Sequence, residues 1–269
     1  MTAYAHAHVK HQPRKRFSQN FLGDESVIAA IVAAIRPAQH DRIVEIGPGL
    51  GALTRPLLAT VKELHAIEID RDLAAGLNAE LGDSLILHVT DALKFDFSTL
   101  GDDLRVVGNL PYNISTPLLF HLADFAGQIR DIHVMLQKEV VARMVAAPAD
   151  SNFGRLSVML QYRFDLEKLL DVPAAAFRPA PSVESAVVRL IPQRPLRHPA
   201  RDETLFANIV RAAFSQRRKT LRNSLRNLLT VDDFAALAIA PTARAQELSI
   251  AQFVALTDRV CALFERRRD

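Results

Sequence analysis

The hydrophobic positions of the chain alternate between two kinds of segment from residue 24 onward. Short apolar runs predict strands at 42–46, 64–69, 85–89, 104–107 and 132–136, because each has the length and aliphatic character of a buried strand. Longer segments predict helices at 24–37, 51–59, 73–81, 117–125 and 138–146. Strands that alternate with helices build a parallel sheet covered on both faces, so the chain is predicted to be an α/β protein with a Rossmann-like sheet.

Two further strands are predicted at the end of this region, at 165–172 and 184–191. Residues 185–190 are especially rich in residue types that favour strands. No helix of comparable length separates the two runs, whereas a parallel crossover normally needs one. A sheet that ends in such a pair is most easily closed by one antiparallel strand at its edge. The prediction is a mostly parallel sheet with one antiparallel edge strand.

Three prolines divide the chain into two parts. Pro192, Pro195 and Pro199 mark a linker, and beyond it helices are predicted at 203–214, 219–229, 231–238 and 249–267. Residues 1–16 show no periodicity and are predicted to be a flexible basic arm. The predicted organisation is the arm at 1–16, an α/β domain at 17–194 and a small all-α domain at 195–269.

Positive charge is concentrated in two segments of the chain. The sequence has 33 Lys and Arg, and ten of them lie in 1–23 and 204–231, which contain no acidic residue. This asymmetry is typical of a protein that binds a polyanion, while a solvated helix face is the alternative for either segment alone. The RNA contacts predicted in the second segment are Arg211, Arg217, Arg218, Lys219, Arg222 and Arg226.

Composition narrows the remaining classes of protein. A single cysteine, Cys261, excludes a framework of internal disulfides. No apolar run is long enough to span a bilayer, and the basic start lacks the apolar segment of a secretory signal. A cytoplasmic protein without membrane contact is therefore expected. No metal site is expected either, because His6, His8 and His11 have no acidic or cysteine partner nearby.

A glycine motif, Glu45-Ile46-Gly47-Pro48-Gly49-Leu50-Gly51, follows a predicted strand and opens a predicted helix. Glycines there allow positive φ and a close approach to a ligand, and the start of the helix supplies free N–H groups. Glu68 ends the next strand, where a carboxylate can accept hydrogen bonds from both ribose hydroxyls of a nucleoside. The same spacing satisfies the dinucleotide pattern G-x-G-x-x-A, so NAD(P) is an alternative for this motif alone.

Two acidic residues favour S-adenosylmethionine over NAD(P). Glu45 precedes the glycines, where a carboxylate would oppose a pyrophosphate but can face a cationic sulfonium ligand. Asp91 ends the third strand and can accept from an adenine amino group, although a helix or turn cap is its other interpretation. The predicted methyl donor is S-adenosylmethionine, and no metal is required.

Asn109-Leu110-Pro111-Tyr112 follows the apolar run at 104–108 and precedes a helix. The nitrogen N6 of adenine is a poor nucleophile, because its lone pair is delocalised into the ring. Hydrogen-bond acceptors that contact the two amino hydrogens favour a pyramidal nitrogen whose lone pair is available. Asn109 offers its side-chain carbonyl and Leu110 its backbone carbonyl, while Pro111 fixes φ and supplies no competing donor. Tyr112 can stack on a flipped base. The four residues are predicted to be catalytic, although alone they would also suit an ordinary turn.

A proline-stiffened loop, Phe177-Arg178-Pro179-Ala180-Pro181-Ser182-Val183, precedes the last strand. Phe177 is predicted either to form the other wall around the target base or to anchor the loop in the core. The sequence favours neither.

These motifs resemble the ribosomal RNA adenine dimethyltransferase family over nearly the whole chain, from about Phe17 to the C-terminal helices. Ser18-Gln19-Asn20-Phe21-Leu22 is similar to the N-terminal donor-binding motif of that family. The glycine motif, Glu68, Asp91, Asn109–Tyr112 and the Phe177 loop follow in family order. Gln216-Arg217-Arg218-Lys219-Thr220-Leu221-Arg222-Asn223-Ser224-Leu225 resembles the start of the helical RNA-binding domain.

The resemblance implies a class I methyltransferase fold and the transfer of four methyl groups from S-adenosylmethionine. The implied acceptors are two adjacent adenosines in a hairpin loop near the 3′ end of 16S rRNA, within the 30S ribosomal subunit or its precursor. The implied role is biogenesis of the small subunit, by a protein that nothing in the sequence requires to be more than a monomer. The donor contacts, from the motifs and the resemblance together, are predicted to be Asn20, Leu22, Gly47, Gly49, Gly51, Glu68, Asp91 and Asn109.

Three other functions are considered. An Erm-type methyltransferase shares the catalytic half but acts on large-subunit rRNA, and the segment at 216–225 favours the small-subunit interpretation. An assembly factor would hold the immature subunit through its basic helices, with methylation secondary. An NAD-dependent oxidoreductase is the most distant alternative, because the sequence shows no catalytic His, Lys or Tyr-x-x-x-Lys pattern.

Overall fold

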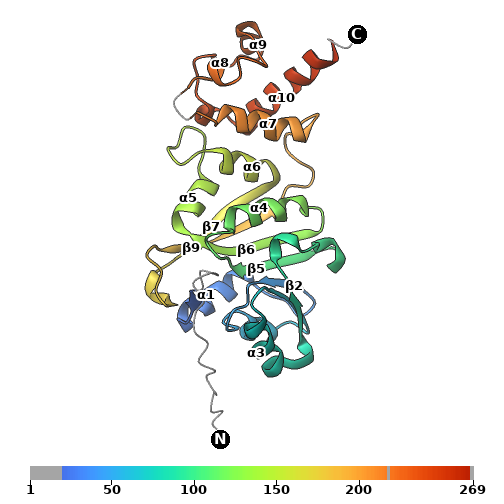
Figure 1. The fold of residues 1–269 in the computed structure, drawn as a ribbon, viewed down its shortest axis with the longest axis vertical. Coiled ribbons are helices and arrows are strands. Elements are labelled where there is room, and N and C mark those ends of the chain that lie inside the picture. The colour runs from blue at the N-terminus through green and yellow to red at the C-terminus, as the bar shows by residue number, and fades with distance from the viewer. Residues whose placement is uncertain (1–19, 217–218, 267–269) are drawn as a thin grey trace, which may run out of the picture.

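A single seven-stranded sheet forms the centre of the molecule (Figure 1). The computed structural model describes residues 20–216 and 219–266. The strands of the sheet are β2 (Arg42–Ile46), β3 (Leu64–Glu68), β4 (Leu85–Val89), β5 (Leu104–Asn109), β6 (Ile129–Gln137), β7 (Phe164–Val172) and β9 (Ser185–Pro192). Two further strands, β1 (Phe21–Leu22) and β8 (Phe177–Arg178), form a separate antiparallel pair.

Helices cover both faces of the sheet, as the alternating pattern predicts. One face carries α1 (Glu25–Ile35), α2 (Thr54–Leu58) and α3 (Arg71–Leu81), and the other carries α4 (Ser115–Asp124), α5 (Lys138–Val145) and α6 (Arg155–Arg163). Beyond α6, at the end of the molecule opposite α1 and α3 in Figure 1, lie α7 (Glu203–Ala213), α8 (Leu221–Ser224), α9 (Val231–Ala236) and α10 (Ile250–Glu265). None of the helices in the described ranges has the length and apolar character that a membrane crossing requires.

The strand order is β4-β3-β2-β5-β6-β9-β7, and every pair from β4 to β6 is parallel. The mostly parallel sheet with one antiparallel strand is confirmed, but the position of that strand differs from the prediction. β9 is antiparallel to both of its neighbours and lies second from the edge, while the edge strand is β7. The reason is burial: six of the eight residues of β9 are buried, whereas exposed charged residues interrupt β7, as suits an edge.

The sequence pattern missed α6 because this helix packs against two cores at once. Leu160 packs in the core between the sheet and α4, whereas Val158 and Tyr162 pack in a second core with α7 and α10. Its apolar residues therefore do not gather on one face, which is the signal that sequence periodicity detects. The helix predicted at 219–229 is also shorter in the structure, where it covers only Leu221–Ser224.

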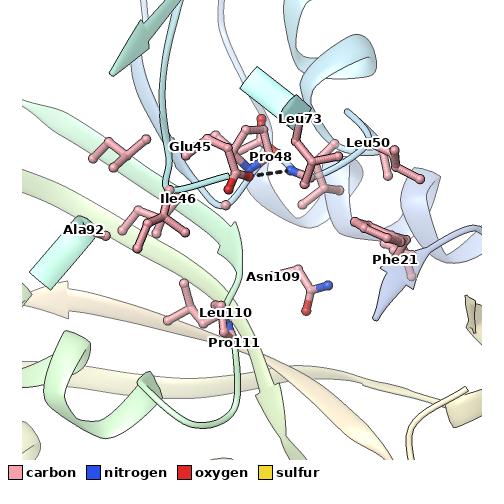
Figure 2. A pocket seen from close by; sticks show the side chains of 18 of the residues that line it. Phe21, Glu45, Ile46, Pro48, Leu50, Leu73, Ala92, Asn109, Leu110 and Pro111 are labelled. Carbon is pink, nitrogen blue, oxygen red and sulfur yellow. Dashed lines mark hydrogen bonds between the residues drawn. The ribbon is translucent and has the colours of Figure 1, made fainter. Parts of the chain in front are cut away.

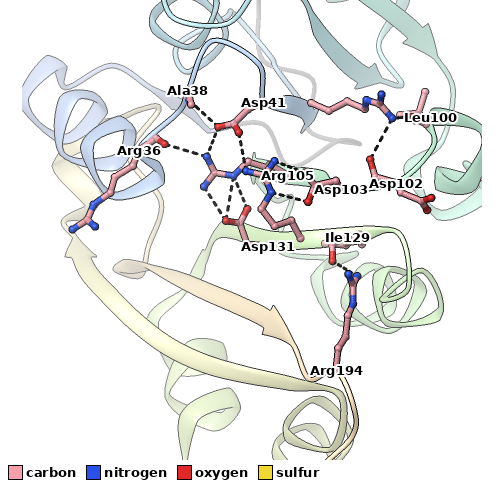
Figure 3. A network of polar contacts seen from close by, with 12 residues as sticks. Arg36, Ala38, Asp41, Leu100, Asp102, Asp103, Arg105, Ile129, Asp131 and Arg194 are labelled. Atoms are coloured by element: carbon pink, nitrogen blue, oxygen red, sulfur yellow. Dashed lines mark hydrogen bonds and ion pairs between the residues drawn. The ribbon is translucent and has the colours of Figure 1, made fainter.

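A buried ion network fastens α1 to the end of the sheet opposite the carboxyl ends of the parallel strands (Figure 3). Arg105 of β5 is buried, and its guanidinium lies 2.6 Å from Asp41 Oδ2 and 2.8 Å from Asp131 Oδ2. It also donates to the carbonyl oxygens of Ile35 and Arg36 at the end of α1. One side chain thus satisfies two carboxylates and two helix carbonyls that lack intrahelical partners.

Replacing Arg105 with Met should lower the free energy of unfolding by about 3–5 kcal/mol, because the buried carboxylate of Asp41 and the largely buried carboxylate of Asp131 each lose an ion-pair partner. Urea denaturation measures the change. Arg197→Met is the matched control, since its ion pair with Asp165 is exposed and should contribute at most about 1 kcal/mol. Equal losses in the two variants would show that the network adds no more than a surface pair.

Candidate active site

A cavity opens at the carboxyl ends of β2, β3, β4 and β5 (Figure 2). The strand pairing explains its position, because parallel strands end at the same edge and their loops meet there. Figure 2 shows Glu45 and Pro48 on one side of this space and Asn109, Leu110 and Pro111 on the other. The cavity brings together most of the residues predicted for the donor and the acceptor: Asn20, Leu22, Gly47, Gly49, Glu68, Asp91, Asn109, Leu110, Pro111 and Tyr112.

The glycine turn adopts the positive φ angles that its sequence predicts. Gly47, Gly49 and Gly51 have φ of 67°, 58° and 81°. A Cβ on Gly49 would lie 3.2 Å from Cδ1 of Phe21, so the turn also accommodates β1. Gly51 does not line the cavity, and a Cβ there would lie 2.9 Å from Arg55 and Leu77 side-chain atoms. The structure therefore gives Gly51 a supporting role in the turn, in place of the predicted donor contact.

Glu68 links β3 to the glycine turn. Its carboxylate accepts hydrogen bonds from the backbone N–H of Asp70 at 2.8 Å and of Gly49 at 3.3 Å. Burial raises the pKa of Glu68, while these hydrogen bonds partly offset that effect. The carboxylate is thus held at the wall of the cavity, where it can accept hydrogen bonds from hydroxyl groups of a ligand.

Glu45 is a buried carboxyl group that faces the cavity without a hydrogen-bond partner for its Oε2 among the described residues. Only 2% of the residue is exposed. Burial, with a smaller contribution from the charge of Glu68, raises the pKa of Glu45 to about 7. A buried carboxyl group with one unpartnered oxygen beside a cavity fits a cationic ligand such as S-adenosylmethionine and would repel a pyrophosphate.

Asp91 lines the cavity and also caps a turn. Its carboxylate accepts from the backbone N–H of Leu93 at 3.0 Å, at the start of the short 3-10 helix Ala92–Lys94. Several cavity residues were not singled out from the sequence, among them two exposed apolar side chains. Leu50 and Ile69 directly follow Gly49 and Glu68, and they form part of the apolar wall of the cavity. Their position beside the motif residues was the available signal.

Asn109 ends β5 with a defined orientation of its side-chain amide. Its Nδ2 donates to the backbone carbonyl of Asn20 at 3.2 Å, which leaves Oδ1 as the acceptor on the other side of the amide. Gly108 lets β5 come this close to the glycine turn, because a Cβ there would lie 2.5 Å from the carbonyl oxygen of Ile46. Gly108 is a further residue that the sequence reasoning did not single out.

The rest of the acceptor motif is fixed by contacts on several sides. The side chain of Leu110 is buried, and its backbone N–H donates to the carbonyl oxygen of Met135 at 3.1 Å. The carbonyl oxygen of Pro111 accepts from Ser115 Oγ at 2.9 Å. Tyr112 lines the cavity, and its hydroxyl lies 2.7 Å from Ser185 Oγ. These contacts hold the motif as a rigid turn between β5 and α4.

Phe177 does not form a wall of this cavity. It is 0% exposed and packs in the core under β1 and α1, in the cluster that contains Leu22 and Ile31. The pairing of β8 with β1 places Phe177 opposite Leu22 and turns its ring inward. The predicted role in the acceptor pocket is therefore corrected, and Phe177 is an anchor of the loop.

The four described basic residues of the set predicted to bind RNA do not line the cavity. Arg211 is in the last turn of α7, and Arg222 is in α8. These two residues, with Lys219 and Arg226, are exposed. Arg217 and Arg218 lie outside the described residues, as does the arm at 1–16. No group of three or more His, Cys, Asp or Glu in residues 20–216 and 219–266 is arranged to hold a metal ion.

Comparison with known proteins identifies the family. The family model described as ribosomal RNA adenine dimethylase matches residues 10–261. The chain belongs to this family. It is therefore an rRNA adenine N6,N6-dimethyltransferase of the class I fold, which uses S-adenosylmethionine as the methyl donor.

Members of the family and related structures agree with this assignment. Ribosomal RNA small subunit methyltransferase A of Thiobacillus denitrificans is 62% identical over 92% of this chain and 97% of the relative. The protein of the same name from Aromatoleum aromaticum is 56% identical over 94% and 96%. A dimethyladenosine transferase from Plasmodium falciparum has a TM-score of 0.76 at 26% identity, covering 92% of this chain and 98% of that one. The 23S rRNA methyltransferase ErmE, at 23% identity and a TM-score of 0.71 over 90% and 100%, shows the shared fold.

Replacing Glu45 with Gln should change how the stability of the free enzyme depends on pH. The pKa of Glu45 is about 7 in the folded protein and about 4.5 in the unfolded chain. As the pH rises from 4.5 to 7, Glu45 therefore loses its proton in the unfolded chain first, and this lowers the free energy of unfolding. Gln removes this loss, which is on the order of 3 kcal/mol above pH 7. Thermal unfolding from pH 4 to 8.5 tests this.

The wild type and the variant should differ least near pH 4, and the difference should level off above pH 7. The same substitution should weaken the binding of S-adenosylmethionine, because a neutral amide replaces the carboxylate that faces the cation. A stability difference that does not change with pH would contradict the raised pKa.

Proposed function

We propose that the enzyme dimethylates N6 of two adjacent adenosines in a hairpin loop near the 3′ end of 16S rRNA, within the 30S subunit or its precursor. The observation that carries this proposal is the set of relatives named for the small subunit, which are 55–62% identical over nearly their whole length. The reaction serves the biogenesis of the small subunit in the cytoplasm. We expect the enzyme to act as a monomer.

The donor half of the cavity is assigned by its chemistry. Glu68 accepts the ribose hydroxyls, and Asp91 accepts from the adenine amino group. Glu45 faces the charged end of the donor, since its carboxyl group is buried there without a partner for Oε2 in the described part of the chain. Asn20, Leu22, Gly47 and Gly49 complete the wall. Gly51 supports the turn from behind.

The acceptor half is assigned to the motif that ends β5. When bound, S-adenosylmethionine supplies the methyl group: the N6 lone pair forms the new N–C bond as the C–S bond breaks, S-adenosylhomocysteine leaves, and N6 releases a proton. Asn109 Oδ1 and the carbonyl oxygen of Leu110 accept from the amino hydrogens. Tyr112 stacks on the base once it has left its own stack. These residues act by orienting N6, which contributes several kcal/mol of about 7–11 available from positioning.

Replacing Asn109 with Ala should reduce kcat by about 100-fold or more, because the variant loses an acceptor aimed at the reacting nitrogen. The measurement is steady-state methyl transfer from labelled S-adenosylmethionine. Binding of 30S particles by this variant should be unchanged, since the RNA-binding surface is elsewhere. A variant with near wild-type kcat would remove Asn109 from the catalytic assignment.

The helical part of the chain beyond the linker is the proposed RNA-binding domain, at 195–269, with 17–194 as the methyltransferase domain. It has its own core, formed by α7 to α10 together with residues of α6. The exposed residues Arg211, Lys219, Arg222 and Arg226 supply positive charge for phosphate contacts. Arg217 and Arg218 belong to the same proposed surface by sequence.

Reversing charge at Arg222 and Arg226 should weaken binding to 30S particles and reduce its dependence on salt. Each phosphate contact that is lost should lower the slope of log affinity against log salt by about 0.7–0.9. Filter binding at several salt concentrations measures both effects. Lys62→Glu is the control, because this exposed lysine precedes β3 at the end of the sheet opposite the cavity. Equal weakening by Asn109→Ala would contradict a separate binding surface.

The substrate is tested by methyl transfer to undermethylated 30S particles, with 50S particles and naked 16S rRNA in parallel. N6,N6-dimethyladenosine in the 3′-terminal hairpin of 30S alone is the expected product. Label in the 50S particle would indicate the large-subunit reaction of an Erm-type enzyme. Binding of the donor and of 30S without methyl transfer would make assembly of the subunit the primary function.

A further inference from the structure

Ser185 is a buried polar residue at the border of the acceptor site. It is the first residue of β9 and is 0% exposed. It does not line the cavity, so its hydroxyl contacts neither side of the reaction directly. The hydroxyl lies 2.7 Å from the hydroxyl of Tyr112, which does line the cavity. The hydroxyl of this fully buried serine thus contacts the acceptor motif from outside the cavity.

The backbone of Ser185 is fixed from both sides. Ser185 pairs with Gln137 of β6 and with Val172 of β7, because β9 lies between these two strands. The backbone N–H of Lys138 donates to the carbonyl oxygen of the preceding Glu184 at 3.0 Å. The Ser185 hydroxyl is thus a fixed point at the edge of the sheet where the cavity opens.

The ring of Tyr112 has less support than the backbone that carries it. Hydrogen bonds and the buried side chain of Leu110 hold the backbone of the turn. The ring itself is partly exposed and can rotate about two side-chain torsions. In the described part of the chain, its hydrogen bond to Ser185 is the one that ties the far end of the ring to the sheet.

We propose that Ser185 is a positioning residue, which holds the Tyr112 ring in place so that the target adenine meets a fixed stacking surface during methyl transfer. The inference rests on the proposed stacking role of Tyr112. It explains why the antiparallel strand β9 begins with a serine, although its other residues are mostly apolar. It also gives the strand pair at the end of the sheet a part in the reaction.

A double-mutant cycle tests this proposal. Ser185→Ala and Tyr112→Phe each remove one partner of the same hydrogen bond. Each should lower kcat by about 3- to 10-fold, the effect expected for one net hydrogen bond. The double variant should be no slower than either single variant, because both substitutions remove one interaction. The affinity for S-adenosylmethionine, measured by calorimetry, should stay unchanged in Ser185→Ala.

The matched control is Ser157→Ala. Ser157 of α6 is equally buried and hydrogen-bonded, to the carbonyl oxygen of Arg143, but it lies outside the cavity. Its unfolding midpoint should fall at least as much as that of Ser185→Ala, with kcat unchanged. A parallel loss of kcat in this control would show that lower stability alone explains the effect.

A spectroscopic measurement reports on the hydrogen bond independently of catalysis. The chain has three tyrosines, Tyr4, Tyr112 and Tyr162, and no tryptophan. With 13C-labelled tyrosine rings, Tyr112→Phe assigns the signal, and Ser185→Ala should shift the Tyr112 resonance while the Tyr162 resonance stays in place. An unshifted Tyr112 signal, an unchanged kcat, or a multiplicative loss in the double variant would each overturn the proposal.

The cycle and the spectra are informative with any RNA that the enzyme methylates. Methyl transfer by the wild type to 50S instead of 30S particles would therefore refute the proposed substrate and leave the role of Ser185 to be decided by the same measurements. A wild-type kcat for Tyr112→Phe with normal transfer to 30S would refute only the positioning role.

Discussion

The close parallel pairing of β2 with β5 is the constraint on which the rest of the structure depends. It brings Glu45 beside Val107 in the register and places the glycine turn next to Asn109. Gly108 makes the approach possible, because any side chain there would meet the backbone of Ile46. Glu45 and Asn109, which lie more than sixty positions apart along the chain, therefore share one cavity.

The buried charged groups at the two ends of these strands differ in whether their atoms have hydrogen-bond partners. At one end, Arg105 is surrounded by Asp41, Asp131 and two helix carbonyls, so that every charge has a partner (Figure 3). At the other end, Glu45 is buried with Oε2 unpartnered within the described ranges. The first arrangement stabilises the fold, whereas the second stores an unfavourable desolvation that a cationic ligand relieves. Stability and ligand binding are thus separated along one pair of strands.

The acceptor motif depends on neighbours from distant parts of the chain. Asn20, just before β1, holds the amide of Asn109, and Ser185 of β9 meets Tyr112. The motif supplies the groups proposed to orient N6, and the surrounding strands hold these groups in place. This explains why a four-residue turn that is common in proteins can form a site in this setting.

The sequence by itself determined the alternation of strands and helices, the glycine turn and the order of the motifs, because these depend on local periodicity and on residues with special backbone angles. It did not determine that β9 lies inside the sheet, that α6 joins two cores, or that Phe177 is buried. Nor did it distinguish Gly51 behind the turn from Gly47 and Gly49 at the cavity. Only the tertiary structure decided these points, because burial and side-chain direction depend on which distant segments pack together.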